Sequence, residues 1–281
     1  MKLEEKWGKL AKRMGGRIVS YYGDSYLEVT RGLIETDHGD IPEFIRRYHL
    51  HLPESFSHKK IYFLDMENCG FNYSSPINTI TIGGINGDII SKTFFALDYH
   101  GERPILRKCL NTLKTADIVF TYNGSAFDTE RLSRRMETYG MFSENGPSSL
   151  KDILGNRHCD LYPIFEEFAR RNDKALLDKK LQTLEKVLFG THREHEIEGR
   201  DIPIIYENFI FGPNGEGNES EIIEQMGRVI DHNIRDVFSL GAALEYLRRE
   251  GYVPKQISNL VSGLVEENPR TGSDVTYIQP Q

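Results

Sequence analysis

Four acidic residues stand at three places in the chain from which their carboxylates could meet at one point. Asp65 and Glu67 close the apolar stretch FLDMEN. Asp128 follows a glycine turn in YNGSAFD, and Asp236 ends the motif DHNIRD. Carboxylates at one point repel each other unless cations neutralise them, and such hard oxygen ligands suit Mg²⁺ or Mn²⁺. Two such ions roughly 3.5–4 Å apart stabilise the attacking and leaving oxygens of a phosphoryl displacement. The residue types therefore predict a two-metal centre that hydrolyses phosphodiester bonds.

Each acid has an expected role in such a centre. Asp65, the first acid on its strand, is the natural ligand to bridge two ions. Glu67 and Asp236 would hold the ion that activates water, and Asp128 would help to hold the other. His232 lies four residues before Asp236, so the two side chains share one face of a helix. A neutral imidazole near pH 7 suits a residue that orients the water or accepts its proton.

Each of these positions also has an ordinary structural interpretation. An Asp at the end of a strand is commonly solvated or caps the next turn. Asp128 could pair with a basic residue of its own helix, and His232 with Asp236 could form an exposed surface pair. The functional hypothesis depends on all the positions occurring together in this order.

The surrounding elements must bring these residues together. Residues 61–68 have the pattern of a buried strand, and the alternation of side chains along a strand projects Asp65 and Glu67 to the same face. The order of three strands, a helix, a fourth strand and then mainly helices predicts an α/β fold with a mixed central sheet flanked by helices. The further expected strands are 77–87, 88–98 and 116–124, and helical spacing marks 103–116, 125–140, 181–190, 202–212 and 219–250.

The chain divides by pattern into three parts. Residues 1–58 are expected to form an N-terminal helix and hairpin extension, residues 59–250 the catalytic domain, and residues 251–281 a polar tail. No apolar run approaches the roughly 20 residues of a membrane span. The first residues lack the apolar region of a secretory signal. We therefore expect no membrane association.

The motifs together resemble those of the DEDD (DnaQ-like) superfamily of 3′–5′ exonucleases. The motifs FLDMEN, TYNGSAFD, TLEKVLFG and HNIRDVFSL are most similar to those of the YprB-type ribonuclease-H-like domain. The resemblance covers about residues 59–248. It implies a ribonuclease-H-like fold and a 3′–5′ exonuclease. It also implies that Asp65, Glu67, Asp128 and Asp236 are metal ligands, and that His232 orients the water.

One spacing departs from the family pattern. Exonucleases of this kind that use His in the third motif usually place it five residues before the Asp, whereas a spacing of four is usual with Tyr. His232 occupies the tyrosine-like position. Its approach to the water could therefore differ from that in its relatives.

The resemblance also places Asn123 and Phe127 near the terminal nucleotide. Tyr122 and Phe127 could stack on a base, since stacking tolerates any sequence. Core packing is an equal alternative for Phe127 and the favoured one for Tyr122. Basic residues could follow a phosphate backbone or form a solvated helix face. The net charge of −7 argues against a protein that grips duplex nucleic acid over its whole surface. The groups of basic residues are Arg131, Arg134 and Arg135, then Arg170 and Arg171, then Lys174, Lys179 and Lys180.

Two further features are open to more than one interpretation. Asp160 in HCDLY could be a fifth acid near the site or the N-cap of the following helix. The three cysteines Cys69, Cys109 and Cys159 lack the paired spacing of a zinc site and are too few for a complete disulfide framework, so we expect the reduced thiols of a cytoplasmic protein.

The leading hypothesis is a 3′–5′ exonuclease that acts on single-stranded or frayed DNA or RNA. A structure-selective endonuclease with the same ligands is one alternative. A non-catalytic nucleic-acid-binding adaptor is the other, although the intact set of acids speaks against it.

Overall fold

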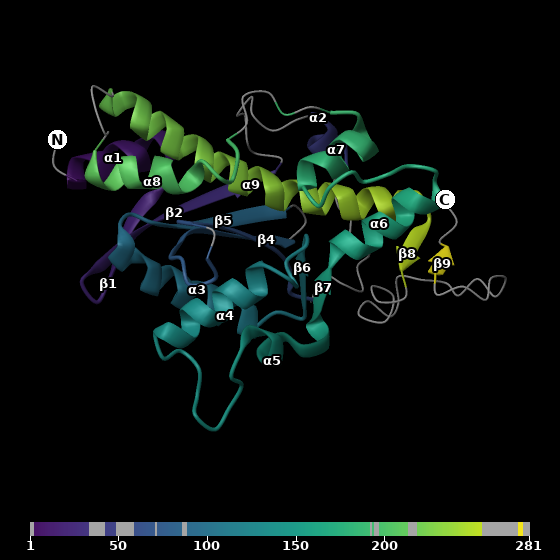
Figure 1. The fold of residues 1–281 in the computed structure, drawn as a ribbon, viewed down its shortest axis with the longest axis horizontal. Coiled ribbons are helices and arrows are strands. Elements are labelled where there is room, and N and C mark those ends of the chain that lie inside the picture. The colour runs from purple at the N-terminus through teal and green to yellow at the C-terminus, as the bar shows by residue number, and fades with distance from the viewer. Residues whose placement is uncertain are drawn as a thin grey trace.

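A seven-stranded sheet is the centre of the computed structural model (Figure 1). The structure describes residues 3–33, 43–48, 59–70, 72–85, 89–191, 193, 197–212, 218–254 and 275–277. The order of the strands is β1-β2-β5-β4-β3-β6-β7. Neighbours from β1 to β3 are antiparallel, whereas β3, β6 and β7 run parallel. The strands are β1 (Arg17–Tyr21), β2 (Asp24–Gly32), β3 (Ile61–Asn68), β4 (Ile77–Ile85), β5 (Ile89–Ala96), β6 (Ile118–Thr121) and β7 (His158–Asp160).

Helices cover both faces of this sheet, and each face has its own hydrophobic cluster. One face carries α3 (Glu102–Lys114), α4 (Asp128–Thr138) and α5 (Leu150–Leu154). The other face carries the long helix α9 and the helices around it (Figure 1). These helices are α1 (Leu3–Met14), α2 (Glu43–Arg47), α6 (Leu161–Arg171), α7 (Leu181–Phe189), α8 (Ile202–Phe211) and α9 (Glu219–Arg249).

The alternation of side chains along β3 decides which face the acids share. Phe63 belongs to the cluster that contains α9, whereas Leu64 and Met66 belong to the cluster that contains α3. Residues two apart on a strand point the same way. Asp65 and Glu67 therefore project from the face that α9 covers.

A glycine lets α9 approach the sheet closely. A Cβ atom on Gly241 would lie 2.1 Å from Ile89 Cδ1 of β5 and 3.6 Å from Phe63 Cε2 of β3. With a larger residue at this position, either the Ile89 side chain or the helix would have to shift, because packed interiors have little free space. The same helix carries His232 and Asp236, so this contact helps to set their height above β3.

The fold expected from the sequence is confirmed: the sheet is mixed, and helices flank it on both sides. The N-terminal hairpin continues this sheet through the pairing of β2 with β5. The boundary expected after residue 58 lies outside the described residues. The expected tail also lies mostly outside them, apart from the short pair β8 (Tyr252–Pro254) and β9 (Val275–Tyr277). No helix in the described ranges is long and apolar enough to cross a bilayer.

Candidate active site

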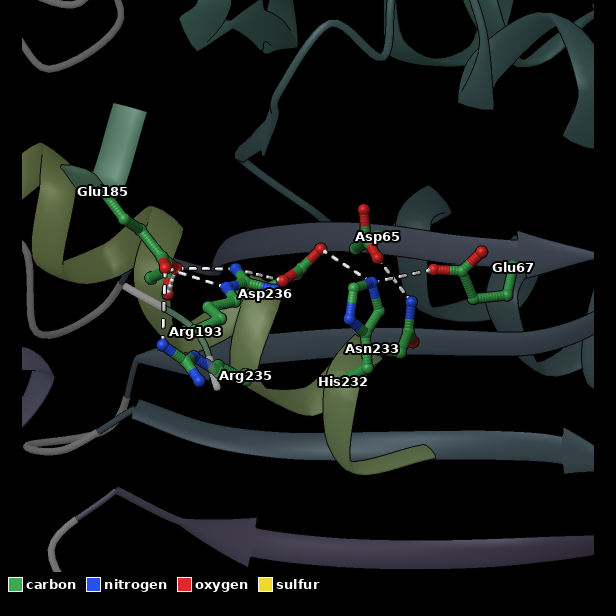
Figure 2. A network of polar contacts seen from close by, with 9 residues as sticks. Asp65, Glu67, Glu185, Arg193, His232, Asn233, Arg235 and Asp236 are labelled. Carbon is green, nitrogen blue, oxygen red and sulfur yellow. Dashed lines mark hydrogen bonds and ion pairs between the residues drawn. The ribbon is translucent and has the colours of Figure 1, made fainter. Parts of the chain in front are cut away.

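The end of β3 and the middle of α9 place three polar side chains in contact. His232 Nε2 lies 3.5 Å from Glu67 Oε1 and 3.5 Å from Asp236 Oδ2. Figure 2 shows the imidazole between the two carboxylates. All three side chains are mostly buried, so their charges are only weakly screened by water. The helical spacing of four residues thus brings His232 and Asp236 together, and the sheet adds Glu67.

Asp65 is held from the same helix by a residue that the motifs did not single out. The amide Nδ2 of Asn233 donates a hydrogen bond to Asp65 Oδ2 (Figure 2). Asn233 is completely buried. Three neighbouring positions of α9 therefore face the acids of β3.

The fourth acid comes from the opposite layer. Asp128 is the first residue of α4, where the unpaired N–H groups of the helix favour a negative charge. The preceding turn passes so close that a Cβ on Gly124 would lie 2.9 Å from Asp128 Oδ2 and 2.5 Å from Thr121 Cβ. A side chain at position 124 would clash with these atoms, so the NG turn requires glycine there. It leaves room for the buried carboxylate of Asp128.

Three of the acids, Asp65, Glu67 and Asp128, have raised pKa values. Burial, and then repulsion by Asp236, Asp128 and Glu67, holds the pKa of Asp65 well above its ordinary range. Burial likewise raises the pKa of Glu67 to about 7, against an opposing effect of His232. The pKa of Asp128 also rises to about 7, through burial and then repulsion by Glu67. The structure thus concentrates negative charge where water is largely excluded.

A buried ion network lies behind Asp236 (Figure 2). Arg193 Nη2 is 2.6 Å from Asp236 Oδ1 and 2.6 Å from Glu185 Oε1. Arg193 Nε also donates to Glu185 Oε2 at 2.8 Å. Ser239 Oγ donates to Glu185 Oε1, and Arg235 Nη2 is 3.5 Å from Glu185 Oε2. Asp236 is therefore in contact with Arg193 on one side and with the imidazole of His232 on the other.

Glu185 and Arg193 were not among the residues predicted from the sequence, although one signal was available for Glu185. Helix α7 buries Leu181, Leu184, Glu185 and Leu188, which lie on one face at the spacing i, i+3, i+4 and i+7. A glutamate on the apolar face of a helix needs a buried partner. Arg193, in a segment that looks like a polar loop, has no comparable signal.

Asp160 serves as both a helix cap and a support for the turn before Asp128. Its carboxylate caps α6 by accepting a hydrogen bond from the N–H of Tyr162, 3.1 Å from Oδ1. It also accepts hydrogen bonds from the N–H of Asn123 (2.7 Å to Oδ1) and of Ser125 (2.9 Å to Oδ2). Asn123 has a positive φ of 57°, so the turn is a strained one that these bonds stabilise.

Exposed aromatic rings and arginines border the acids. Phe127 and Tyr73 are 42% and 39% exposed, which leaves their rings open to a ligand. The guanidinium of Arg131 lies 5.4 Å from the centre of the Tyr73 ring and 5.9 Å from that of Phe127. Arg131 also opposes the rise in the pKa of Glu67 and Asp128, so its charge reaches the acids. Arg134 lies 5.0 Å from the Tyr73 ring.

Two of the expected substrate contacts have different surroundings. The Tyr122 ring is partly buried and packs edge-on against Tyr162 of α6, with 5.6 Å between the ring centres. Arg135 is paired with the buried Glu102 at 2.6 Å and also bonds the carbonyl oxygen of Ser74. Both side chains have contacts within the fold, in contrast to the open ring of Phe127.

The donor set is chemically suited to divalent cations, because it consists of carboxylate oxygens and an imidazole. Some of these oxygens have protein partners, since Asp65 is bonded to Asn233 and Asp236 is paired with Arg193. In the part of the chain that is described, no group of three or more His, Cys, Asp or Glu side chains is arranged so that it could hold a metal ion.

Comparison with known proteins extends these observations. A DNA polymerase of Methanocaldococcus jannaschii is 31% identical over 101 residues, which cover 32% of this chain and 6% of the polymerase. The solved family B DNA polymerase from the hyperthermophilic archaeon Pyrobaculum calidifontis matches with 18% identity and a TM-score of 0.49, over 68% of this chain and 25% of the polymerase. The chain thus spans a minor part of the length of either relative. The RNase_H superfamily itself matches residues 62–248, a range that runs from β3 to the end of α9. The chain belongs to the RNase_H superfamily.

Proposed function

We propose that this chain is a metal-dependent nuclease of the DEDD type that hydrolyses phosphodiester bonds from a 3′ end. The observation that carries the proposal is the contact of His232 Nε2 with Glu67 and Asp236, 3.5 Å from each, beside Asp65 and Asp128. Membership of the RNase_H superfamily supports a nuclease-type domain. The polymerase relatives are consistent with nucleic acid as the partner.

The four carboxylates are the groups we assign to metal binding. Asp65, Glu67, Asp128 and Asp236 would hold Mg²⁺ or Mn²⁺, two ions per site. Bound ions would offset the repulsion that helps to raise the pKa values of Asp65, Glu67 and Asp128, and would stabilise the charge that develops on the phosphate. Because the amide of Asn233 contacts Asp65, we expect ion binding to be accompanied by a small rotation of the Asp65 carboxylate.

His232 is the residue that we assign to the water. Its Nε2 faces the space between Glu67 and Asp236, so a water molecule held there would be within reach of the ring. A neutral imidazole can accept the proton of such a water as the water attacks phosphorus. The tyrosine-like spacing is compatible with this role, because a spacing of four places His232 beside Asp236 on α9.

Phe127, Tyr73 and Arg131 are the residues that we assign to the substrate. Single-stranded nucleic acid exposes the faces of its bases, and aromatic rings bind them without reading the sequence. The guanidinium of Arg131 lies 5.4 and 5.9 Å from the centres of these two rings, and its charge acts on Asp128, so it could contact a phosphate bound there. We place Asn123 near the terminal nucleotide because it begins the turn that leads to Asp128. A single-stranded or frayed end fits this small patch better than a duplex does.

The test is a time course on 5′-labelled single-stranded DNA and RNA with Mn²⁺, with an EDTA control and a circular strand of the same sequence. DNA comes first because the relatives are DNA polymerases. The proposal predicts a ladder that shortens with time, needs Mn²⁺ and is absent with the circle. Cleavage of the circular strand would show that the activity is that of an endonuclease and not of an exonuclease. Binding without any cleavage would favour an adaptor.

A further inference from the structure

The network behind Asp236 contains charges that the proposed reaction does not itself require. Arg193 and Glu185 are only 3% and 2% exposed, and neither is among the residues assigned to metal, water or substrate. Burying two charges is costly unless each is fully paired. Each is paired with an opposite charge here, Glu185 with Arg193 and Arg193 also with Asp236.

The guanidinium of Arg193 contacts two carboxylates. Its Nε and Nη2 both donate to Glu185, which fixes the orientation of the guanidinium. The same Nη2 lies 2.6 Å from Oδ1 of Asp236. The planar guanidinium is rigid and cannot follow a moving partner as a lysine could. The ion pair therefore holds Oδ1 of Asp236 beside a fixed positive charge, while Oδ2 faces His232.

Glu185 is in turn braced by the same helix that carries Asp236. Ser239 donates to its Oε1, and Arg235 lies 3.5 Å from its Oε2. Asp236, Arg235 and Ser239 all belong to α9, and they are linked to one another through Glu185 of α7 and through Arg193 (Figure 2). A carboxylate that binds metal is usually oriented by such outer partners, and their loss commonly weakens metal binding or activity by about 10- to 100-fold.

We propose that Arg193, fixed by Glu185, is a positioning residue that turns Asp236 so that one carboxylate oxygen is presented to a divalent ion. This inference rests on the proposed function, because it assumes that Asp236 binds metal. It assigns the TLEKVLFG helix a part in the site. A competing effect has the opposite sign, since a positive charge beside a cation weakens its binding. We expect orientation to outweigh that repulsion because Glu185 neutralises the guanidinium.

The test measures Mn²⁺ binding directly, by the electron paramagnetic resonance signal of the free ion, on protein whose folding is checked by circular dichroism. Glu185→Gln and Arg193→Gln should weaken Mn²⁺ binding by about 10- to 100-fold. Arg193→Lys keeps the charge but loses the fork, so it should give a smaller loss. If the glutamine variants fail to fold, the Mn²⁺ affinity of Arg193→Lys still tests the inference.

Glu245→Gln is the matched control. Glu245 is fully buried on α9 and pairs with Arg248 and Arg249 at 2.7 and 2.8 Å, away from the acids. It should leave Mn²⁺ binding unchanged. Unaltered or tighter Mn²⁺ binding by Arg193→Gln, or an equal loss in Glu245→Gln, would overturn the inference while leaving the proposed function intact. Failure of the unmodified protein to bind Mn²⁺ would overturn both.

Discussion

Nε2 of His232 is equally distant from Glu67 Oε1 and Asp236 Oδ2, at 3.5 Å from each. One carboxylate belongs to a strand of the sheet and the other to the helix that covers it. Their common neighbour therefore sits at the junction of the two layers. This position makes the imidazole a candidate to transfer a proton between the two carboxylates that we assign to metal binding.

Replacement of His232 tests its role separately from the ligands. His232→Ala should lower the single-turnover rate by about 10²- to 10⁴-fold, which is the usual contribution of a general base. Mn²⁺ binding should change little, because the four carboxylates remain. His232→Tyr should keep part of the rate, since the spacing to Asp236 is the one usual with tyrosine. His100→Ala, an exposed histidine away from these acids, is the control. A full rate in His232→Ala would remove the residue from the mechanism.

The raised pKa values predict how the metal-free protein responds to pH. The pKa of Glu67 is about 7 in the folded protein and 4.5 when unperturbed, so the folded state binds the proton more tightly. Stability from this group is complete below about pH 4.5 and is lost as the pH rises to about 7. A shift of this size corresponds to a loss on the order of 3 kcal/mol.

Thermal unfolding in EDTA at pH 5 and pH 8 measures this effect. Glu67→Gln should be more stable than the unmodified protein at pH 8 and should lose that advantage at pH 5. Mn²⁺ should stabilise the unmodified protein most at pH 8, where the acids are charged. An identical pH dependence in the two proteins would contradict the assignment of the shift to Glu67.

Asp160 should affect both stability and activity, because it caps α6 and holds the turn before Asp128. Asp160→Ala removes three hydrogen bonds from backbone N–H groups, and we expect a loss of about 2–3 kcal/mol. The rate should also fall at temperatures where the variant is folded. Ser149→Ala, which removes only a cap of α5, should cost about 1 kcal/mol and spare the rate. If Asp160→Ala and Ser149→Ala cleave the substrate at equal rates, the role of Asp160 is limited to capping α6.

Tyr73 should contribute to the binding of single strands. In an Asp65→Asn background that prevents cleavage, Tyr73→Ala should weaken the binding of a labelled single strand by roughly 5-fold or more, since stacking on one ring contributes about 1–3 kcal/mol. Fluorescence anisotropy gives the dissociation constant. Tyr22→Ala is the control, because Tyr22 is 92% exposed at the tip of the β1–β2 hairpin. Equal affinities would remove Tyr73 from the substrate surface.

Local patterns in the sequence were enough to predict the mixed sheet and the pairing of His232 with Asp236. Alternation along 61–68 placed Asp65 and Glu67 on one face, and helical spacing paired His232 with Asp236; both contacts with His232 are present in the structure. The mixed sheet followed from the order of the elements. These inferences succeed because each depends on periodicity within one segment or on the sequence of segments.

Contacts between residues that are far apart in the sequence could not be predicted in this way. Nothing local indicates that Arg193 reaches Asp236, or that Asn233 bonds Asp65, because both depend on how α9 lies on the sheet. Asp160 was open to two interpretations, and the structure supports the cap while adding the bonds to the turn of Asn123. Tyr73 was missed because its neighbours Arg131 and Arg134 come from another element.

The central claim is that the acids at the end of β3 hold the metal ions that cleave nucleic acid. The most direct test compares the Mn²⁺-dependent shortening of a 5′-labelled single strand by the unmodified protein, Asp65→Asn and Asp173→Asn. Asp173 is exposed and has a φ of 53°, which asparagine tolerates, so its substitution should be harmless. The account predicts that Asp65→Asn falls to the level of the EDTA control while Asp173→Asn keeps the full rate. Undiminished cleavage by folded Asp65→Asn would contradict it.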